Sequence, residues 1–198
     1  MSDSAVTRRS KAKSDRRSQL IAAAERLVAE RGYLAVRLED IGSAVGISGP
    51  AIYRHFPNKE ALLVELLVGI STRLLAGAQE VTALAHTPAE SLNGLVDFHL
   101  DFVFGESDLI RIQDRDLAHL PDTAKRQVRR SQRQYVEIWV SVLTRLDPDL
   151  AEDDARVMAH AAFGLLNSTP YSVRPAAPKS HSRAVLRRMT LAALTAGD

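Results

Sequence analysis

Hydrophobic side chains recur along most of the chain at the three- and four-residue spacing of α-helices. Leu20, Ala24 and Leu27 open this pattern, which runs from about residue 16 to 31, and Gly32 stands where a left-handed residue would end a helix. Similar stretches predict further helices at about 38–45, 48–56, 59–83, 88–103, 107–119, 121–146, 150–167 and 182–196. No segment shows the alternation of a β-strand between turn signals. The pattern therefore predicts an all-α protein of nine helices.

Three regions differ in composition along this helical pattern. Residues 1–14 are rich in Ser, Lys and Arg and poor in apolar side chains, so we expect a disordered basic tail. Residues 15–60 hold short predicted helices around a tight turn and form a first domain. Residues 61–198 hold longer predicted helices and form a second domain. A length of 198 residues suits either two small domains or one large one.

Basic residues concentrate near the N-terminus. Residues 1–60 carry 11 Lys and Arg against 7 Asp and Glu, whereas the remainder carries 15 against 17. A basic first third suits a polyanionic partner such as nucleic acid. For the first residues themselves, a solubilising tail and an arm in the DNA minor groove are both open interpretations.

The composition excludes several classes of protein. The chain has no Cys, which excludes disulfides, thiol nucleophiles and thiolate metal sites. No two of its six His stand at the spacing of a zinc-protease helix, and we expect neither a metal nor a cofactor. The sequence shows no secretory signal and no apolar run long enough to span a bilayer. We therefore expect a cytoplasmic protein without a membrane partner.

The stretch from Leu38 to His55 has the pattern of a helix, a tight turn and a second helix. Ile41 and Ile52 are spaced to pack the two helices together, and Gly46 ends the first of them. Ser48 is a good N-cap for the second. This is the pattern of a helix-turn-helix, whose second helix enters the major groove of DNA.

The same stretch resembles the DNA-binding domain of the tetracycline-repressor (TetR) family. The resemblance runs from about Ser18 to Leu67 and rests on Arg31-Gly-Tyr and on LEDIGSAVGISGPAIYRHFPNKEALL from Leu38 to Leu63. It implies a homodimeric transcriptional repressor with a ligand-binding C-terminal domain. One position departs from the family pattern, because Arg37 occupies the place of the usual Thr cap. A cation at that place is suited to contact a phosphate.

The resemblance also implies which residues meet double-stranded operator DNA. Phosphate contacts fall on Tyr53, His55 and Lys59. Small residues at the start of the second helix, followed by an arginine, lie nearest the bases. The predicted DNA-binding set is Arg37, Ser48, Gly49, Pro50, Ala51, Tyr53, Arg54, His55 and Lys59.

The second predicted domain resembles actinobacterial regulators of fatty-acid or sterol catabolism, which respond to ligands of the acyl-CoA type. The resemblance rests on the segments 109–121 and 129–139. Apolar and aromatic residues on the inward helix faces suit a small hydrophobic effector that one or two hydrogen bonds orient. The predicted ligand-binding residues are Val96, His99, Phe102, Val103, Tyr135, Trp139, Met158 and Phe163.

These residues also have a purely structural interpretation. His99 is either a core histidine bonded to the backbone or a polar group that lines a pocket. Tyr135 and Trp139 are either core residues or part of a ligand cage. A set of arginines is either a solvated face or a site for the phosphates of an effector, namely Arg111, Arg115, Arg129, Arg130 and Arg133.

Two C-terminal helices carry small and apolar side chains that permit close helix packing. The family resemblance makes them the dimer interface, as a four-helix bundle with the partner's pair. Internal core packing is the alternative. The predicted interface residues are Ala161, Ala162, Leu165, Val185, Leu186 and Met189.

The sequence offers little to an enzyme. The glycines at 42, 46 and 49 follow no strand and precede no Lys-Ser/Thr pair, so they do not form a phosphate loop. No Ser stands in a G-x-S-x-G elbow. We therefore predict a ligand-responsive repressor that binds a palindromic operator and is released by a hydrophobic effector. The alternatives are a regulator of drug efflux or other catabolism that senses an aromatic molecule, a transcriptional activator, and a helical interaction protein that does not bind DNA.

Overall fold

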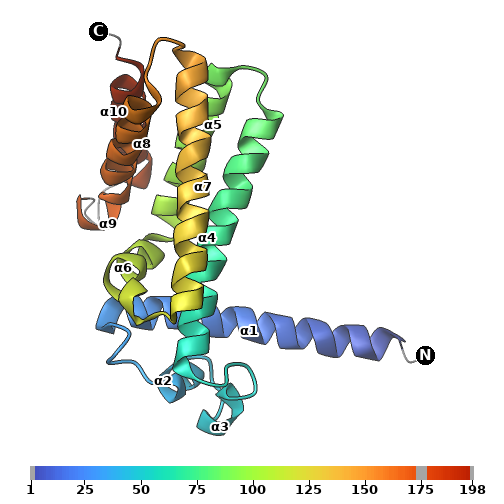
Figure 1. The fold of residues 1–198 in the computed structure, drawn as a ribbon. Helices are drawn as coiled ribbons and strands as arrows, with labels where there is room; N and C mark the ends of the chain where they lie inside the picture. The colour runs from blue at the N-terminus through green and yellow to red at the C-terminus, as the bar shows by residue number, and fades with distance from the viewer. Residues whose placement is uncertain (1–2, 173–177, 197–198) are drawn as a thin grey trace. The chain divides into compact units, whose positions relative to one another are not determined.

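A computed structural model describes residues 3–172 and 178–196, and every regular element in these residues is a helix (Figure 1). The helices are α1 (Asp3–Arg31), α2 (Leu38–Ala44), α3 (Gly49–Ile52), α4 (Lys59–Leu84), α5 (Pro88–Gly105), α6 (Ser107–Asp116), α7 (Asp122–Leu146), α8 (Glu152–Asn167), α9 (Thr169–Ser172) and α10 (Lys179–Thr195). A 3₁₀ turn, η1 (Leu117–His119), follows α6. The predicted all-α fold is confirmed. The nine expected helices are present, and α9 is a short addition where the sequence predicted a stop; the expected loop at Pro175 lies outside the described residues.

The N-terminal segment is helical, which differs from the predicted disordered tail over residues 1–14. No Gly or Pro occurs within Asp3–Arg31, so nothing interrupts the backbone ladder that the apolar part of α1 begins. The other end of α1 is as expected. Gly32 adopts a φ of +90°, and its N–H donates to the carbonyl of Val28 at 2.8 Å.

The chain divides into two compact units. The first comprises Met1–Leu67 and Arg111–Lys125, and the second comprises Val68–Ile110 and Arg126–Asp198. The expected boundary at residue 60 therefore moves to the interior of α4. Residues 111–125 join the first unit, where the guanidinium of Arg115 donates to the carbonyls of Val28 and Ala29 at the end of α1.

The first unit contains the predicted helix-turn-helix. Gly46 takes a φ of +72° between α2 and α3, and the N–H of Ile47 donates back to the carbonyl of Gly42 at 3.0 Å. Ile41 and Ile52 are fully buried, as their spacing indicated. Ser48 occupies the N-cap position of α3, but its side chain makes no capping hydrogen bond, in contrast to our expectation.

The second unit has a continuous apolar core to which α4, α5, α7, α8 and α10 contribute. Trp139 is its largest fully buried side chain. Helix α10 packs against α8 and α5. At the α5 contact the carboxylate of Asp97 accepts hydrogen bonds from Arg183 and Arg187 at 3.0 and 2.9 Å. Burial raises the pKa of Asp97, but these two hydrogen bonds outweigh it and leave the pKa below its ordinary value.

Two glycines set the close approach of α4 and α5. A Cβ at Gly77 would lie 2.2 Å from the ring of Phe98, and a Cβ at Gly94 would lie 2.7 Å from Val81. Neither position therefore accepts a larger residue unless a neighbour moves. Phe98 is next to His99 in α5, so this crossing also fixes where His99 lies.

Helix α4 is long and apolar enough to cross a membrane by length and composition alone, contrary to our expectation that no stretch would qualify. Its leucines have another role in the structure. Leu62, Leu63, Leu66 and Leu67 are at most 3% exposed, and Ile70 is 2% exposed. A core helix that is packed on several sides has the same composition.

Candidate nucleic-acid interface and buried polar cluster

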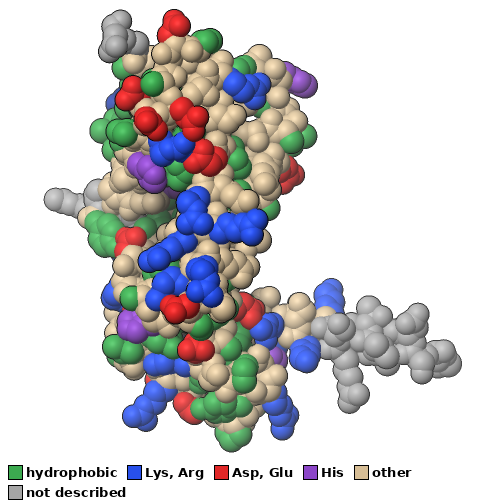
Figure 2. All heavy atoms as spheres, in the orientation of Figure 1, with side chains coloured by type: hydrophobic (Ala, Val, Ile, Leu, Met, Phe, Trp, Pro, Cys, Tyr) green, Lys and Arg blue, Asp and Glu red, His purple; other side chains and the backbone are tan. Residues whose placement is uncertain are grey.

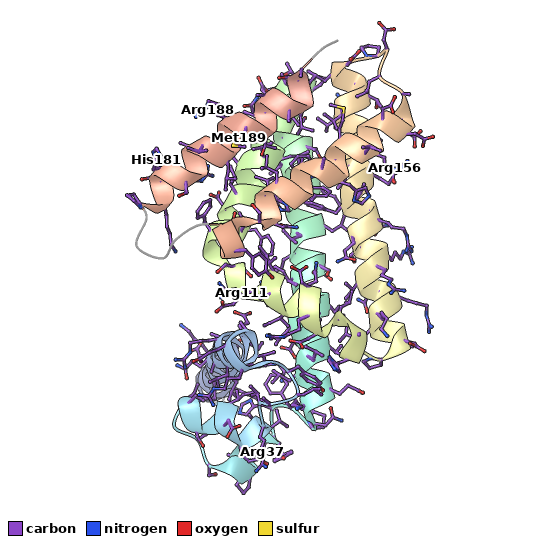
Figure 3. All side chains as sticks on the ribbon, turned by 90° about the vertical axis from the view of Figure 1, so that its left-hand side faces the viewer. Arg37, Arg111, Arg156, His181, Arg188 and Met189 are labelled. Atoms are coloured by element: carbon purple, nitrogen blue, oxygen red, sulfur yellow. The ribbon has the colours of Figure 1, made fainter. Side chains whose placement is uncertain are left out.

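Three of the predicted DNA-binding residues line one hollow on the first unit. Arg37, Tyr53 and Lys59 border a space of about 260 Å³, together with Asn58 and Glu39. Arg37 precedes α2, and its backbone N–H donates to the Asp40 carboxylate at 2.9 Å, which replaces the missing Thr cap. Its guanidinium is exposed (Figure 3). The hollow thus combines cationic and hydroxyl donors that suit a phosphate.

Glu39 brings a carboxylate into the same hollow. The hydroxyl of Tyr53 donates to Glu39 Oε1 at 2.5 Å. This hydrogen bond lowers the pKa of Glu39 and raises that of Tyr53. A phosphate that entered the hollow would have to take the hydroxyl of Tyr53 away from Glu39.

Lys59 lies differently from what its predicted phosphate contact requires. Its ammonium donates to the carbonyls of Tyr33, Leu34 and Val36, at 2.9, 3.3 and 3.0 Å. It also lies 4.4 Å from the centre of the Tyr33 ring. An ammonium has three N–H groups, so these carbonyls use all of its donors. In this conformation Lys59 holds the segment between α1 and α2 and has no donor left for DNA.

His55 also faces inward in part. Its Nδ1 is buried and has no hydrogen-bond partner among the described residues. Burial and the nearby charges of Arg17, Lys13 and Arg16 lower its pKa, so the ring is neutral at pH 7. A neutral imidazole is a weaker phosphate ligand than the cation.

The remaining predicted DNA contacts form the outer side of the turn and α3. Ser48, Pro50 and Arg54 are exposed, and Gly49 and Ala51 are half-buried. No hydrogen bond or ion pair is recorded for the guanidinium of Arg54. This leaves Arg54 as the cation of α3 that is available for base contacts.

Arg17 has a role that its place in the basic segment did not reveal. Its guanidinium stacks 4.4 Å from the centre of the Phe56 ring and donates to the carboxylate of Glu65 and to the carbonyl of His55. It therefore ties α1 to the residues that follow α3. The sequence signal for this role was weak, because the three partners lie 38 to 48 residues away.

Five predicted ligand-binding residues come together in the second unit. The ring of His99 lies 5.4 to 6.2 Å, between centroids, from the rings of Phe102, Tyr135, Trp139 and Phe163. Trp139 and Phe163 are themselves in edge-to-face contact at 5.0 Å. We call these five residues the aromatic cluster. Val96 and Val103 are fully buried in the same core.

Two hydrogen bonds hold His99 within the aromatic cluster. Its Nε2 is 2.9 Å from Asn167 Oδ1, and its Nδ1 is 2.9 Å from the hydroxyl of Tyr135. Because Asn167 presents an acceptor, Nε2 carries the proton and Nδ1 accepts from Tyr135. Burial lowers the pKa of His99 to about 4 and raises that of Tyr135, so both are neutral at pH 7. These are side-chain partners, whereas the structural interpretation expected a backbone carbonyl.

Met158 lies apart from these rings. It borders a hollow of about 560 Å³ between the ends of α7, α8 and α10, with Leu143, Leu150, Asp154 and Leu194 among the other lining residues. The structure therefore does not bring Met158 to the aromatic cluster by any recorded contact.

The predicted interface residues divide into two groups. Ala161 and Met189 are exposed, and Leu165 and Val185 are half-buried. Ala162 and Leu186 are 5% and 8% exposed and belong to the core of their own chain, so their assignment to the interface was wrong. Small residues face either side of a helix equally well, and the sequence spacing did not separate Ala161 from Ala162.

An exposed apolar face nevertheless runs along α8 and α10. Val157, His160, Ala161 and Gly164 follow one another at i, i+3, i+4 and i+7 on α8, and all four are exposed. Helix α10 adds Met189, which is 48% exposed, beside Arg188, Ala192 and Ala193 (Figure 3). Val157 is 68% exposed, and the sequence analysis had overlooked it.

The predicted arginines also separate. Arg115 is used inside the first unit, as described above, and Arg111 has an interaction of its own. Arg129, Arg130 and Arg133 are exposed on α7, and Figure 2 shows Lys and Arg side chains gathered over this part of the helix. A solvated face describes these three arginines in the present structure.

Comparison with known proteins places these features in context. Residues 20–66 match the family described as bacterial regulatory proteins, tetR family, and residues 85–188 match the tetracyclin repressor-like C-terminal domain. The chain is 29% identical over 132 residues to the transcriptional repressor KstR2 of Rhodococcus jostii, a match that covers 66% of this chain and 65% of that protein. The chain spans about two thirds of the length of the first curated relatives that it matches.

Solved structures agree on the fold. The ketosteroid transcriptional regulator KstR2 of Mycobacterium tuberculosis superposes with a TM-score of 0.78 at 24% identity, over 90% of this chain and 93% of that one. The regulator AibR, solved with isovaleryl coenzyme A and operator DNA, superposes with a TM-score of 0.75 at 18% identity, over 88% and 97%. At these identities the likeness concerns the fold alone.

Proposed function

The chain belongs to the TetR family of bacterial regulatory proteins, and we propose that it is a cytoplasmic, homodimeric repressor that binds a palindromic operator and releases it when a hydrophobic effector binds. The observation that carries the DNA-binding half is the α2–turn–α3 arrangement with Pro50, Tyr53 and Arg54 on its exposed side. The observation that carries the effector half is the aromatic cluster with its buried polar groups.

Dimerisation supplies the second half-site of a palindrome. Two recognition helices must lie about 34–36 Å apart to enter successive major grooves. The exposed face of Val157, Ala161, Gly164 and Met189 is apolar and made largely of small residues, which suits a four-helix bundle with a second copy of the chain. We assign the dimer interface to this face.

A population shift couples the effector to DNA release. The chain passes between the two units within α4, α6 and α7. An effector that binds better to a conformer with another spacing of recognition helices lowers operator affinity by that difference in binding free energy. Among hydrophobic effectors, an acyl-CoA or sterol-derived thioester is our specific candidate, since AibR was solved with such a thioester.

Arg54→Ala tests the DNA-binding half. If Arg54 contacts a base, we expect the substitution to cost about 1–3 kcal/mol of binding free energy on the operator and much less on random DNA. Fluorescence anisotropy with DNA from upstream of the protein's own gene measures both affinities. Arg145→Ala, which removes an exposed arginine of α7, is the matched control. Equal losses on both DNAs would make Arg54 a backbone contact, and absence of any binding by the wild type would contradict the proposed function.

Gly164→Arg tests the dimer interface. A Cβ at Gly164 meets no atom within 4 Å, so the protomer itself accepts a side chain there. In the dimer the new guanidinium would be buried without a partner, and we expect the dissociation constant to rise by roughly 100-fold or more. Sedimentation equilibrium measures the change, with Ser141→Arg on exposed α7 surface as control. A wild-type monomer at micromolar concentration, or an unaffected Gly164→Arg dimer, would contradict this assignment.

A further inference from the structure

The aromatic cluster contains one polar group whose hydrogen-bonding capacity is unused. Tyr135 donates its only proton to His99, and His99 donates its own to Asn167, so these donors are occupied. The indole Nε1 of Trp139 is buried and has no hydrogen-bond partner among the described residues. Buried N–H groups without a partner are rare in folded proteins and call for an explanation.

The surroundings of Trp139 are free of charge. No Asp, Glu, Lys or Arg is buried among the described residues of the second unit; its buried polar residues are Ser71, Ser91, His99, Thr169 and Thr190. His99 is neutral at pH 7, for the reason given above. A carboxylate or ammonium placed here would lose its hydration without gaining a counter-ion, which is strongly unfavourable.

The cluster is also within reach of solvent. Phe102 and Phe163 are only partly buried, although Trp139 and His99 behind them are closed off. Asn167, at the end of α8, is likewise partly exposed. A small molecule can therefore reach Trp139 if the side chain of Phe102 or Phe163 turns aside.

We propose that the effector is an uncharged apolar molecule with a carbonyl-type acceptor, and that this acceptor takes the hydrogen bond of Trp139 Nε1. The inference rests on the proposed function for the existence of an effector and adds its chemical class. Ketones, esters and thioesters fit this description. Free carboxylic acids, which are anionic at pH 7, and amines do not.

Four molecules that share one ring and differ in one polar group test the proposal. They are cyclohexanone, cyclohexane, cyclohexanecarboxylate and cyclohexylamine. Trp139 is the only Trp, so a protein labelled with ¹⁵N-indole gives one side-chain N–H resonance to follow. Dissociation constants come from the same titrations, and from ligand-induced shifts in Tm for an unlabelled variant.

Trp139→Phe removes the N–H and keeps an aromatic ring. We expect cyclohexanone to move the indole proton downfield in the wild type and to bind Trp139→Phe about 3- to 10-fold more weakly. Cyclohexane should bind both proteins within about twofold, and neither charged ring should bind at millimolar concentration. The comparison of the two neutral rings cancels any general loosening of the core in the variant.

Several results would overturn the proposal. These are equal affinity of cyclohexanone for the two proteins, tighter binding of the carboxylate or the amine than of the ketone, and an indole resonance that none of the four rings moves. All titrations are done without DNA. Failure of operator binding by the wild type would therefore refute the proposed function and leave these results standing, whereas failure of the ring series with normal operator binding would refute only the effector class.

Discussion

Replacing Trp139 with alanine is expected to lower the free energy of unfolding by about 3–5 kcal/mol, the range found for the truncation of large buried aromatic residues. Trp139 is fully buried in the second unit. Its ring contacts those of His99, Tyr135 and Phe163, so truncation removes three ring contacts and leaves a cavity. Chemical denaturation followed by far-UV circular dichroism measures the loss.

Trp139→Phe serves as the control for Trp139→Ala. It keeps most of the apolar volume and removes a donor that is already unpaired, so its cost should be well below that of the alanine variant. A loss under about 1 kcal/mol for Trp139→Ala would mean that the site tolerates an empty space and behaves as a preformed pocket rather than as packed core. This outcome would strengthen the ligand-cage interpretation of Trp139 and Tyr135.

This expectation changes how the variant can be used. The sequence alone suggested that Trp139→Ala would leave operator binding intact and weaken only induction. The structure shows that the alanine variant is a stability variant first, because the indole fills the centre of the core. Trp139→Phe is the variant that separates ligand recognition from folding.

Helix positions were predictable because local spacing determines them. The buried residues Leu20, Ala24 and Val28 of α1 recur at three- and four-residue intervals, and Gly32 ends the helix in the left-handed conformation that its lack of a Cβ allows. The turn at Gly46 was predictable for the same reason. The aromatic cluster was also foreseen, since each of its members lies on the inward face of its helix.

Long polar side chains were not predictable in the same way. Arg17 and Arg115 reach partners that lie between 38 and 87 residues away, and nothing in their immediate neighbourhood marks those partners. Arg115 helps to place residues 111–125 with the first unit, which no local pattern indicated. Charge composition shows that a cation is present, but the choice between solvent, DNA and a buried carbonyl depends on tertiary structure.

Lys59→Met is expected to destabilise the first unit by roughly 3 kcal/mol. Methionine keeps the apolar stem of lysine and removes the ammonium that bonds to the carbonyls of Tyr33, Leu34 and Val36. Hydrogen bonds from a charged donor contribute about 1.5–3 kcal/mol each, and the partial exposure of this site reduces their sum. Denaturation curves measure the loss, and amide hydrogen exchange should locate it in the segment between α1 and α2. Glu60→Gln, at the exposed neighbouring position, is the control.

The same variant decides between the two roles of Lys59. A lysine that neutralises a phosphate contributes about 0.9 to the slope of log K against log salt, so its removal would make that slope shallower by about 1. With all three donors committed to backbone carbonyls, Lys59 neutralises no phosphate, and the slope for Lys59→Met should equal that of the wild type at a temperature where both are folded. A shallower slope with unchanged stability would show that the ammonium leaves these carbonyls when DNA binds. The phosphate contact would then be real, and the internal bonds would belong to the DNA-free protein.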